Sequence, residues 1–165
     1  MPLGDPMGGE QEYGEIGKLK GVWIASIPVS DLGAGLDFYA NVLGLKLVID
    51  SKENNWVELG SPDLLGNIAL YEPSPFDTRQ PGGPTGIVFR TESIYDVHRR
   101  LVDSDVRFML KPERQEWGGL LAVFLDPEDN ELSVMEDPEH YTRSIAEDIG
   151  LDMGGKCFMD RNRIE

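Results

Sequence analysis

Few side chains in this sequence could do acid–base, nucleophilic or metal chemistry. The 165 residues contain two histidines and one cysteine. Because Cys157 is alone, an intrachain disulfide and a thiolate-rich zinc site are excluded. No base or oxyanion site can be assigned to it, so we expect an inert or intermolecularly oxidisable thiol. His98 and His140 fall on or at the start of predicted helices, where we expect solvated or helix-end side chains.

Charged residues on predicted strands are the remaining candidates for acid–base chemistry. Glu58 lies in the segment NWVELG and Arg90 in the segment GIVFRT. Opposite charges across a sheet form structural ion pairs more often than acid–base couples. We therefore expect Glu58 and Arg90 to pair with each other structurally.

The charge balance excludes several kinds of partner. The formal net charge is -15, with 30 acidic and 15 basic residues, and it repels phosphate backbones and anionic lipid headgroups. We expect neither a nucleic-acid partner nor a membrane partner. Apolar runs stop at about six to eight residues, and the N-terminus lacks the basic and apolar regions of a secretion signal. A cytoplasmic location is therefore expected.

The elements that must position these residues are predicted to form a single domain, residues 18–137. Residues 1–17 are rich in Gly, Pro and Glu and are expected to be a mobile tail. Module one, residues 18–73, is predicted to begin with a strand and a helix that starts at Ser30 or Asp31 and ends at Gly44. Its predicted strands cover residues 19–29, 45–50, 55–60 and 67–72.

The same order of elements is predicted again after a Pro- and Gly-rich linker at residues 74–84. Module two, residues 85–137, has a predicted helix at 94–102, and its predicted strands cover residues 86–91, 106–110, 120–125 and 132–135. The fold class is therefore α+β, with two βαβββ modules that pair into a curved, cup-shaped mixed sheet with the helices outside. Residues 138–165 are predicted to form a helical appendage, with Tyr141, Ile145 and Ile149 at helical spacing.

Two stretches carry a resemblance to a known family. The first combines VSDL at 29–32, LDFY at 36–39 and VLGL at 42–45, and the second is FLDPEDN at 124–130, which is similar to a Phe-x-Asp-Pro-Asp-Gly-Asn turn. Together they resemble the vicinal oxygen chelate superfamily, which includes glyoxalase I, extradiol dioxygenases and bleomycin-resistance proteins. The resemblance covers about residues 19–136. It implies paired βαβββ modules, in agreement with the periodicity, and a homodimer, since modules of this superfamily often join across subunits.

The resemblance also implies where a metal ion would be held. Metal-using members take His, Glu or Gln ligands from the first and last strands of each module. Carried over to this sequence, those positions are Ile24, Ala69, Ile87 and Ser133. None of these side chains can anchor a catalytic divalent ion. A one-residue slip would bring in Glu131 or Glu136 without a histidine, so we expect no divalent metal and no other cofactor.

What remains is a cup for a small molecule. If strand parity holds, its lining is Ile24, Ser26, Ala69, Tyr71, Ile87, Phe89 and Ser133. Candidates for its rim, near strand ends, are Trp56, Arg114 and Trp117. Such a cup suits a flat or hydrophobic ligand, so we predict a protein that binds an apolar or aromatic small molecule without a metal.

Two alternatives stay open. One is a lyase, isomerase or dioxygenase of the glyoxalase kind, with a displaced metal site or with metal-free chemistry by polar groups such as Glu58, Tyr71 and Glu136. The other is an interaction module in which the same side chains close on each other as an ordinary core. A well-formed apolar pocket would favour the binding protein over the interaction module.

Overall fold

A computed structural model of the chain describes residues 19, 21–60 and 66–137. The predictions for the two terminal segments, with His140 and Cys157, lie outside these residues. The first module consists of β1 (Ile24–Pro28), α1 (Leu32–Asp37), a π-helical turn (Phe38–Val42), β2 (Lys46–Ser51), a 3-10 turn (Lys52–Asn54), β3 (Trp56–Gly60) and β4 (Asn67–Tyr71). The second consists of β5 (Gly83–Thr91), α2 (Ile94–Asp103), β6 (Phe108–Arg114), β7 (Leu120–Leu125) and β8 (Asn130–Glu136). The predicted repeat of two βαβββ modules is confirmed.

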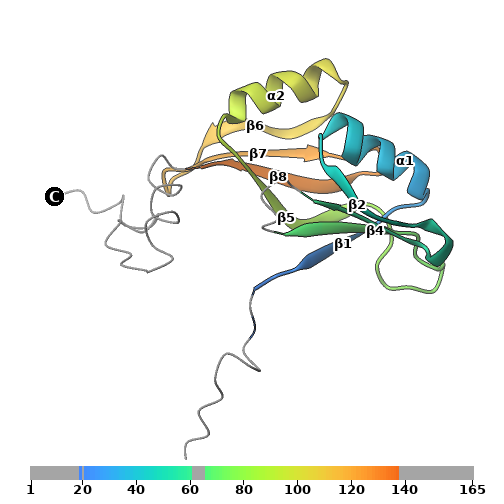
Figure 1. The fold of residues 1–165 in the computed structure, drawn as a ribbon. Helices are drawn as coiled ribbons and strands as arrows, with labels where there is room; N and C mark the ends of the chain where they lie inside the picture. The colour runs from blue at the N-terminus through green and yellow to red at the C-terminus, as the bar shows by residue number, and fades with distance from the viewer. Residues whose placement is uncertain (1–18, 20, 61–65, 138–165) are drawn as a thin grey trace, which may run out of the picture.

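Each module folds into its own four-stranded mixed sheet. The strand orders are β1-β4-β3-β2 and β5-β8-β7-β6, and the first strand of each module pairs in parallel with the last. Among the described strands, no hydrogen-bonded ladder joins the two sheets. Figure 1 shows both helices above the strands, so each sheet has a helix side and an open face away from the helices.

The first helix begins and ends where the sequence predicts. Asp31 accepts a hydrogen bond from the backbone N–H of Ala34 at 2.7 Å, which caps the helix, and Gly44 has a φ of +82° after the helical segment. Gly35 weakens the helix but lies against the sheet. A Cβ added there would lie 3.2 Å from Leu70 Cδ1, so the glycine lets α1 approach β4 closely.

A glutamate at the end of the last strand of each module completes the helix start: Glu72 directly follows β4, and Glu136 is the last residue of β8. Glu72 Oε1 accepts from the backbone N–H of Leu32 at 2.9 Å, and Glu136 Oε2 accepts from that of Ile94 at 2.9 Å. A carboxylate at a helix N-terminus satisfies an unpaired N–H and opposes the helix dipole. In both modules a strand-end glutamate therefore fixes the helix over its sheet.

One core joins the helix sides of the two sheets. Its fully buried members include Ile27, Leu59 and Leu70 from the first module and Leu101 and Leu132 from the second. The core is therefore continuous across the modules. Within the described residues, no helix has the length and apolar character needed to cross a bilayer.

Strand lengths differ from the prediction at the sheet edges. β1 is shorter than predicted, because it begins at Ile24 rather than at residue 19. β5 begins at Gly83, inside the predicted linker, and β6 continues past Pro112 to Arg114. Both strands tolerate proline because each lies at the edge of its sheet, where one row of backbone groups is unpaired.

Candidate functional site

The open face of the first sheet gathers four of the residues predicted to line the cup. Ser26 pairs with Ala69, and Ala69 pairs on its other side with Glu58, so these three side chains share one face. Ile24 and Tyr71 lie two residues from Ser26 and Ala69 on β1 and β4, so they share that face too. The predicted parity of the first module is correct.

Glu58 is a nearly buried carboxylate on this face, with an exposed fraction of 8%. Its Oε1 accepts a hydrogen bond from the indole Nε1 of Trp56 at 2.8 Å. Trp56 was predicted as a rim residue, and in the structure its indole holds the Glu58 carboxylate on the open face by this hydrogen bond.

The expected ion pair between Glu58 and Arg90 is wrong. Arg90 Nη2 lies 2.9 Å from Asp137 Oδ2 instead. The register explains this partner: Arg90 is opposite Met135 in the parallel pair of β5 and β8, so its side chain lies next to the end of β8. Glu58 belongs to the other sheet.

The parity predicted for β5 is wrong. Ser133 pairs with Val88, so Val88 lies on the open face beside Ser133. Ile87 and Phe89 point to the other side and pack against the core. A register shift between Pro84 and Val88, next to Gly86 at a φ of +73°, breaks the regular alternation of the strand.

The open face of the second sheet is apolar and partly exposed. Val88, Ser133, Val123 and Leu110 form one row across its four strands. Val88 is 53% exposed and the other three are half-buried. Leu121 and Met135 pair in the next row. This face offers apolar surface to a ligand or to another chain.

Two predicted rim residues lie at the turn between β6 and β7. Arg114 Nη1 donates to the carbonyl oxygen of Gly118 at 2.6 Å, which closes the turn. Trp117 is half-buried in the same turn. The structure therefore places both at the tip of a hairpin, and Arg114 has a role in the turn itself.

Arg79 is a candidate site residue that sequence analysis missed. Its guanidinium donates to Ser26 Oγ at 3.1 Å and to Ser26 O at 2.7 Å, which places a cation at the β1 edge of the open face. It comes from the predicted linker, whose own hydrogen bonds include Gln80 Nε2 to the carbonyl oxygen of Ser74 at 2.8 Å. In the sequence, the only indication of this role was a positively charged residue within a Pro- and Gly-rich segment.

The turn that carries the family resemblance connects the modules. Asp126 is buried and its carboxylate accepts from Tyr39 Oη at 2.8 Å. Asn130 Nδ2 donates to Asp126 and to the carbonyl oxygen of Pro28 at the end of β1. Burial raises the pKa of the Tyr39 phenol well above its ordinary value, and the negative charge and hydrogen bond of Asp126 raise that pKa further. The turn is therefore a structural lock.

His98 is packed rather than solvated as expected. It lies in α2, and its ring meets the ring of Phe108 edge to face with centroids 4.6 Å apart. Its Nε2 is buried and has no hydrogen-bond partner among the described residues. The helix turns this residue toward β6, so it does not reach the open face.

A pocket of about 530 Å³ lies between the first sheet and β5. We call it the junction pocket. Ala25, Leu59 and Ile68 form one wall, and Ile87 and Phe89 form the other. The junction pocket also touches Asn67, the partner of Ile24 across β1 and β4, and so reaches the edge of the open face. Two predicted lining residues thus line a pocket on the helix side, and five lie on the open faces.

A family model described as the Glyoxalase/Bleomycin resistance protein/Dioxygenase superfamily matches residues 22–134. The paired βαβββ modules and this match define the chain as a member of that superfamily. No curated protein matches the sequence.

Several solved structures superpose on most of the chain. A superfamily member from Sphaerobacter thermophilus is 35% identical, with a TM-score of 0.67, and the match covers 72% of this chain and 98% of that one. TnmS3, an antibiotic binding protein from Streptomyces sp. CB03234, is 26% identical, with a TM-score of 0.65, covering 73% of this chain and 98% of that one. A lactoylglutathione lyase from Agrobacterium tumefaciens, 17% identical with a TM-score of 0.58, covers 72% of this chain and 94% of that one and shares the fold.

The residues present do not fit the divalent metal that the superfamily implies. Of the four carried-over positions, Ile24 and Ala69 have hydrocarbon side chains on the open face. Ser133, which lies beside Val88, has a single hydroxyl group. Glu136, which a one-residue slip would recruit, binds a helix N-terminus instead. No three His, Cys, Asp or Glu side chains gather into a possible metal site within the described part of the chain.

Proposed function

We propose that this protein binds an apolar or aromatic small molecule between its two modules without a metal ion. The observation that carries the proposal is the junction pocket of about 530 Å³. Its volume lies within the range of about 300–1,000 Å³ typical of small-molecule sites, and its named walls are apolar. TnmS3, at 26% identity, is an antibiotic binding protein, which supports a binding role.

A polar group at the edge of the junction pocket would orient the ligand. Asn67, the first residue of β4, lines the pocket and is half-buried. The facing side chains, Ile87 and Phe89 of β5, are apolar. The arrangement suits an aromatic molecule with a few polar substituents.

The test uses N-phenylnaphthylamine, a neutral aromatic fluorophore, as the probe. Ala25→Trp places an indole in the junction pocket, so we expect at least about tenfold weaker binding than for the wild type. Ala34→Trp adds the same group on the exposed surface of α1 and should bind as the wild type does. Fluorescence titration measures both, with thermal unfolding as a check on folding.

A different result would favour the enzyme alternative. Chelator-treated protein is heated with Zn, Ni, Mn, Fe(II), Co or Mg, and we expect no ion to shift the unfolding transition. A native-state ligand at 100 times its dissociation constant would stabilise by about 2.7 kcal/mol. A metal-induced shift of the unfolding transition that disappears when Glu58 or Glu131 is replaced would contradict the proposal. Equal binding of the probe by Ala25→Trp and the wild type would contradict it too.

The same proposal includes a homodimer in which a second copy covers the open faces. Val88 is 53% exposed in an apolar row, and a sheet face of this kind is a common contact between chains. Val88→Lys should convert a dimer into a monomer in sedimentation velocity. Val102→Lys makes the same change at a residue of α2 that is 47% exposed and should leave the dimer intact. A monomeric wild type would disprove this part.

A further inference from the structure

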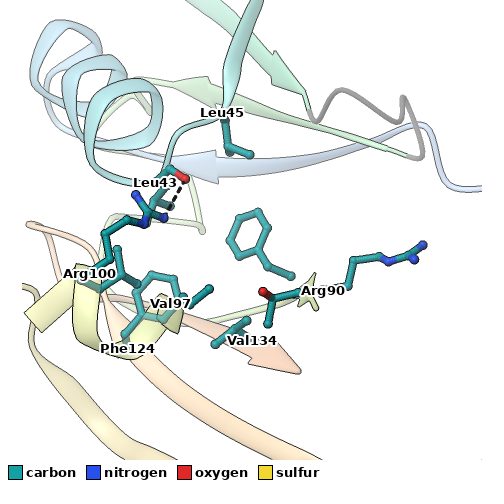
Figure 2. A pocket seen from close by; sticks show the side chains of 10 residues that line it. Leu43, Leu45, Arg90, Val97, Arg100, Phe124 and Val134 are labelled. Carbon is teal, nitrogen blue, oxygen red and sulfur yellow. Dashed lines mark hydrogen bonds between the residues drawn. The ribbon is translucent and has the colours of Figure 1, made fainter. Parts of the chain in front are cut away.

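A second, smaller pocket of about 130 Å³ lies on the helix side, between the modules. Figure 2 shows its lining. Phe89, Phe124 and Val134 of the second sheet form the floor. Val97 and Arg100 of α2 form one wall, and Leu43 and Leu45 from the first module close the other. We call it the helix-side pocket.

The helix-side pocket adjoins the junction pocket. Leu45 and Phe89 line both pockets. Arg90 also lines both, but Figure 2 shows its side chain running away from the helix-side pocket. Its Nη2 lies 2.9 Å from Asp137 Oδ2.

The apolar floor and walls predict an apolar occupant. Removal of apolar surface from water is favourable, so a ligand that covers this lining with an apolar group gains free energy. A cavity of about 150 Å³ is known to hold one benzene ring, so a volume of about 130 Å³ fits a single aromatic ring.

One cation stands at the edge of this space. Arg100 donates from Nη1 to the carbonyl oxygen of Val42 at 2.6 Å and from Nη2 to that of Leu43 at 3.3 Å. A guanidinium has five N–H donors, so others remain available. Its neighbour Arg99 lies 3.0 Å from Asp96, whereas no carboxylate of the described chain is within ion-pair distance of Arg100.

We propose that the helix-side pocket is a second ligand site, which binds a small aromatic carboxylate. The ring lies on Phe89, Phe124 and Val134, and the carboxylate accepts hydrogen bonds from Arg100. Both halves of this ligand are matched by the site. The volume and the apolar lining match the ring, and Arg100, whose partners in the described part of the chain are carbonyl oxygens alone, matches the anion. The proposal does not depend on a ligand in the junction pocket.

Benzoate is the probe for the test, with the full chain observed by NMR. We expect saturable binding and nuclear Overhauser effects between the benzoate ring protons and the methyl groups of Val97 and Val134. Benzyl alcohol, which has the ring without the charge, should bind at least about tenfold more weakly. These measurements use the wild-type chain, so they do not depend on the folding of a variant.

Variants then assign the two halves of the ligand. Arg100→Gln should weaken benzoate binding at least about tenfold, and Arg99→Gln should leave it unchanged. Val97→Phe fills the pocket and should abolish binding, whereas Ala25→Trp should preserve it. No saturable benzoate binding by the wild type, full binding by Val97→Phe, or loss of binding in Ala25→Trp would each overturn the proposal.

Discussion

Asp126→Ala should lower the free energy of unfolding by about 3–4 kcal/mol, measured by urea denaturation at neutral pH. The carboxylate of Asp126 is 2% exposed and accepts four hydrogen bonds. The donors are Tyr39 Oη at 2.8 Å, the backbone N–H of Glu128 at 2.8 Å, and the backbone N–H and Nδ2 of Asn130 at 2.9 and 2.7 Å. Alanine would leave these donors without their acceptor, and buried unsatisfied donors are costly.

The effect should be specific to this carboxylate. Asp129 lies in the same turn with an exposed side chain that pairs with Arg107, and its φ of +64° is tolerated by asparagine. Asp129→Asn removes one negative charge from the turn and should change stability by no more than about 0.5 kcal/mol. If Asp126→Ala and Asp129→Asn had similar effects, the turn would not be the lock between the modules.

The second large effect is a loss of stability at alkaline pH that depends on Tyr39. Its side chain is fully buried, and the pKa of its phenol is raised by burial and by Asp126. A tyrosine in the unfolded chain ionises near pH 10. Above about pH 10 the unfolded chain therefore loses a proton that the folded chain retains. The free energy of unfolding then falls by up to about 1.4 kcal/mol for each unit by which the pH rises.

Replacement of the phenol isolates this contribution. Tyr39→Phe removes the ionisable group, so its unfolding free energy should fall less steeply with pH than that of the wild type. Below pH 10 the variant should be less stable, because the Asp126 carboxylate loses one donor. Tyr95→Phe, at an exposed position on α2, should show the wild-type slope. Equal slopes for Tyr39→Phe and the wild type above pH 10 would contradict the prediction.

Local sequence signals predicted the elements well, because the interactions that form them are close in the chain. The hairpin of β7 and β8 comes from two apolar runs around residues 126–130, and its turn bonds join residues at most four apart. The cap at Asp31, one of the two predicted candidates, and the left-handed Gly44 also agree with the prediction. Residue type and spacing suffice for such features.

The candidate site was harder to predict, because its residues come from segments that are distant in the chain. Ile87, Val88 and Phe89 are all apolar, so the sequence alternation does not show which of them faces the core. The shift of register beside Gly86 decides it, and that shift depends on pairing with β8. Arg79 reaches Ser26 across 53 residues, which no local pattern could indicate.

The sequence by itself determined the class of this protein: an α+β domain of two βαβββ modules in the glyoxalase and bleomycin-resistance superfamily, without the usual metal-ligating residue types at the carried-over positions. Tertiary structure alone decided which side chains share a face, how the modules are locked through Tyr39 and Asp126, and where the two pockets lie. The reason is physical. Strands and turns depend on neighbours in the chain, whereas a pocket exists only where packed segments from both modules fail to fill the space between them.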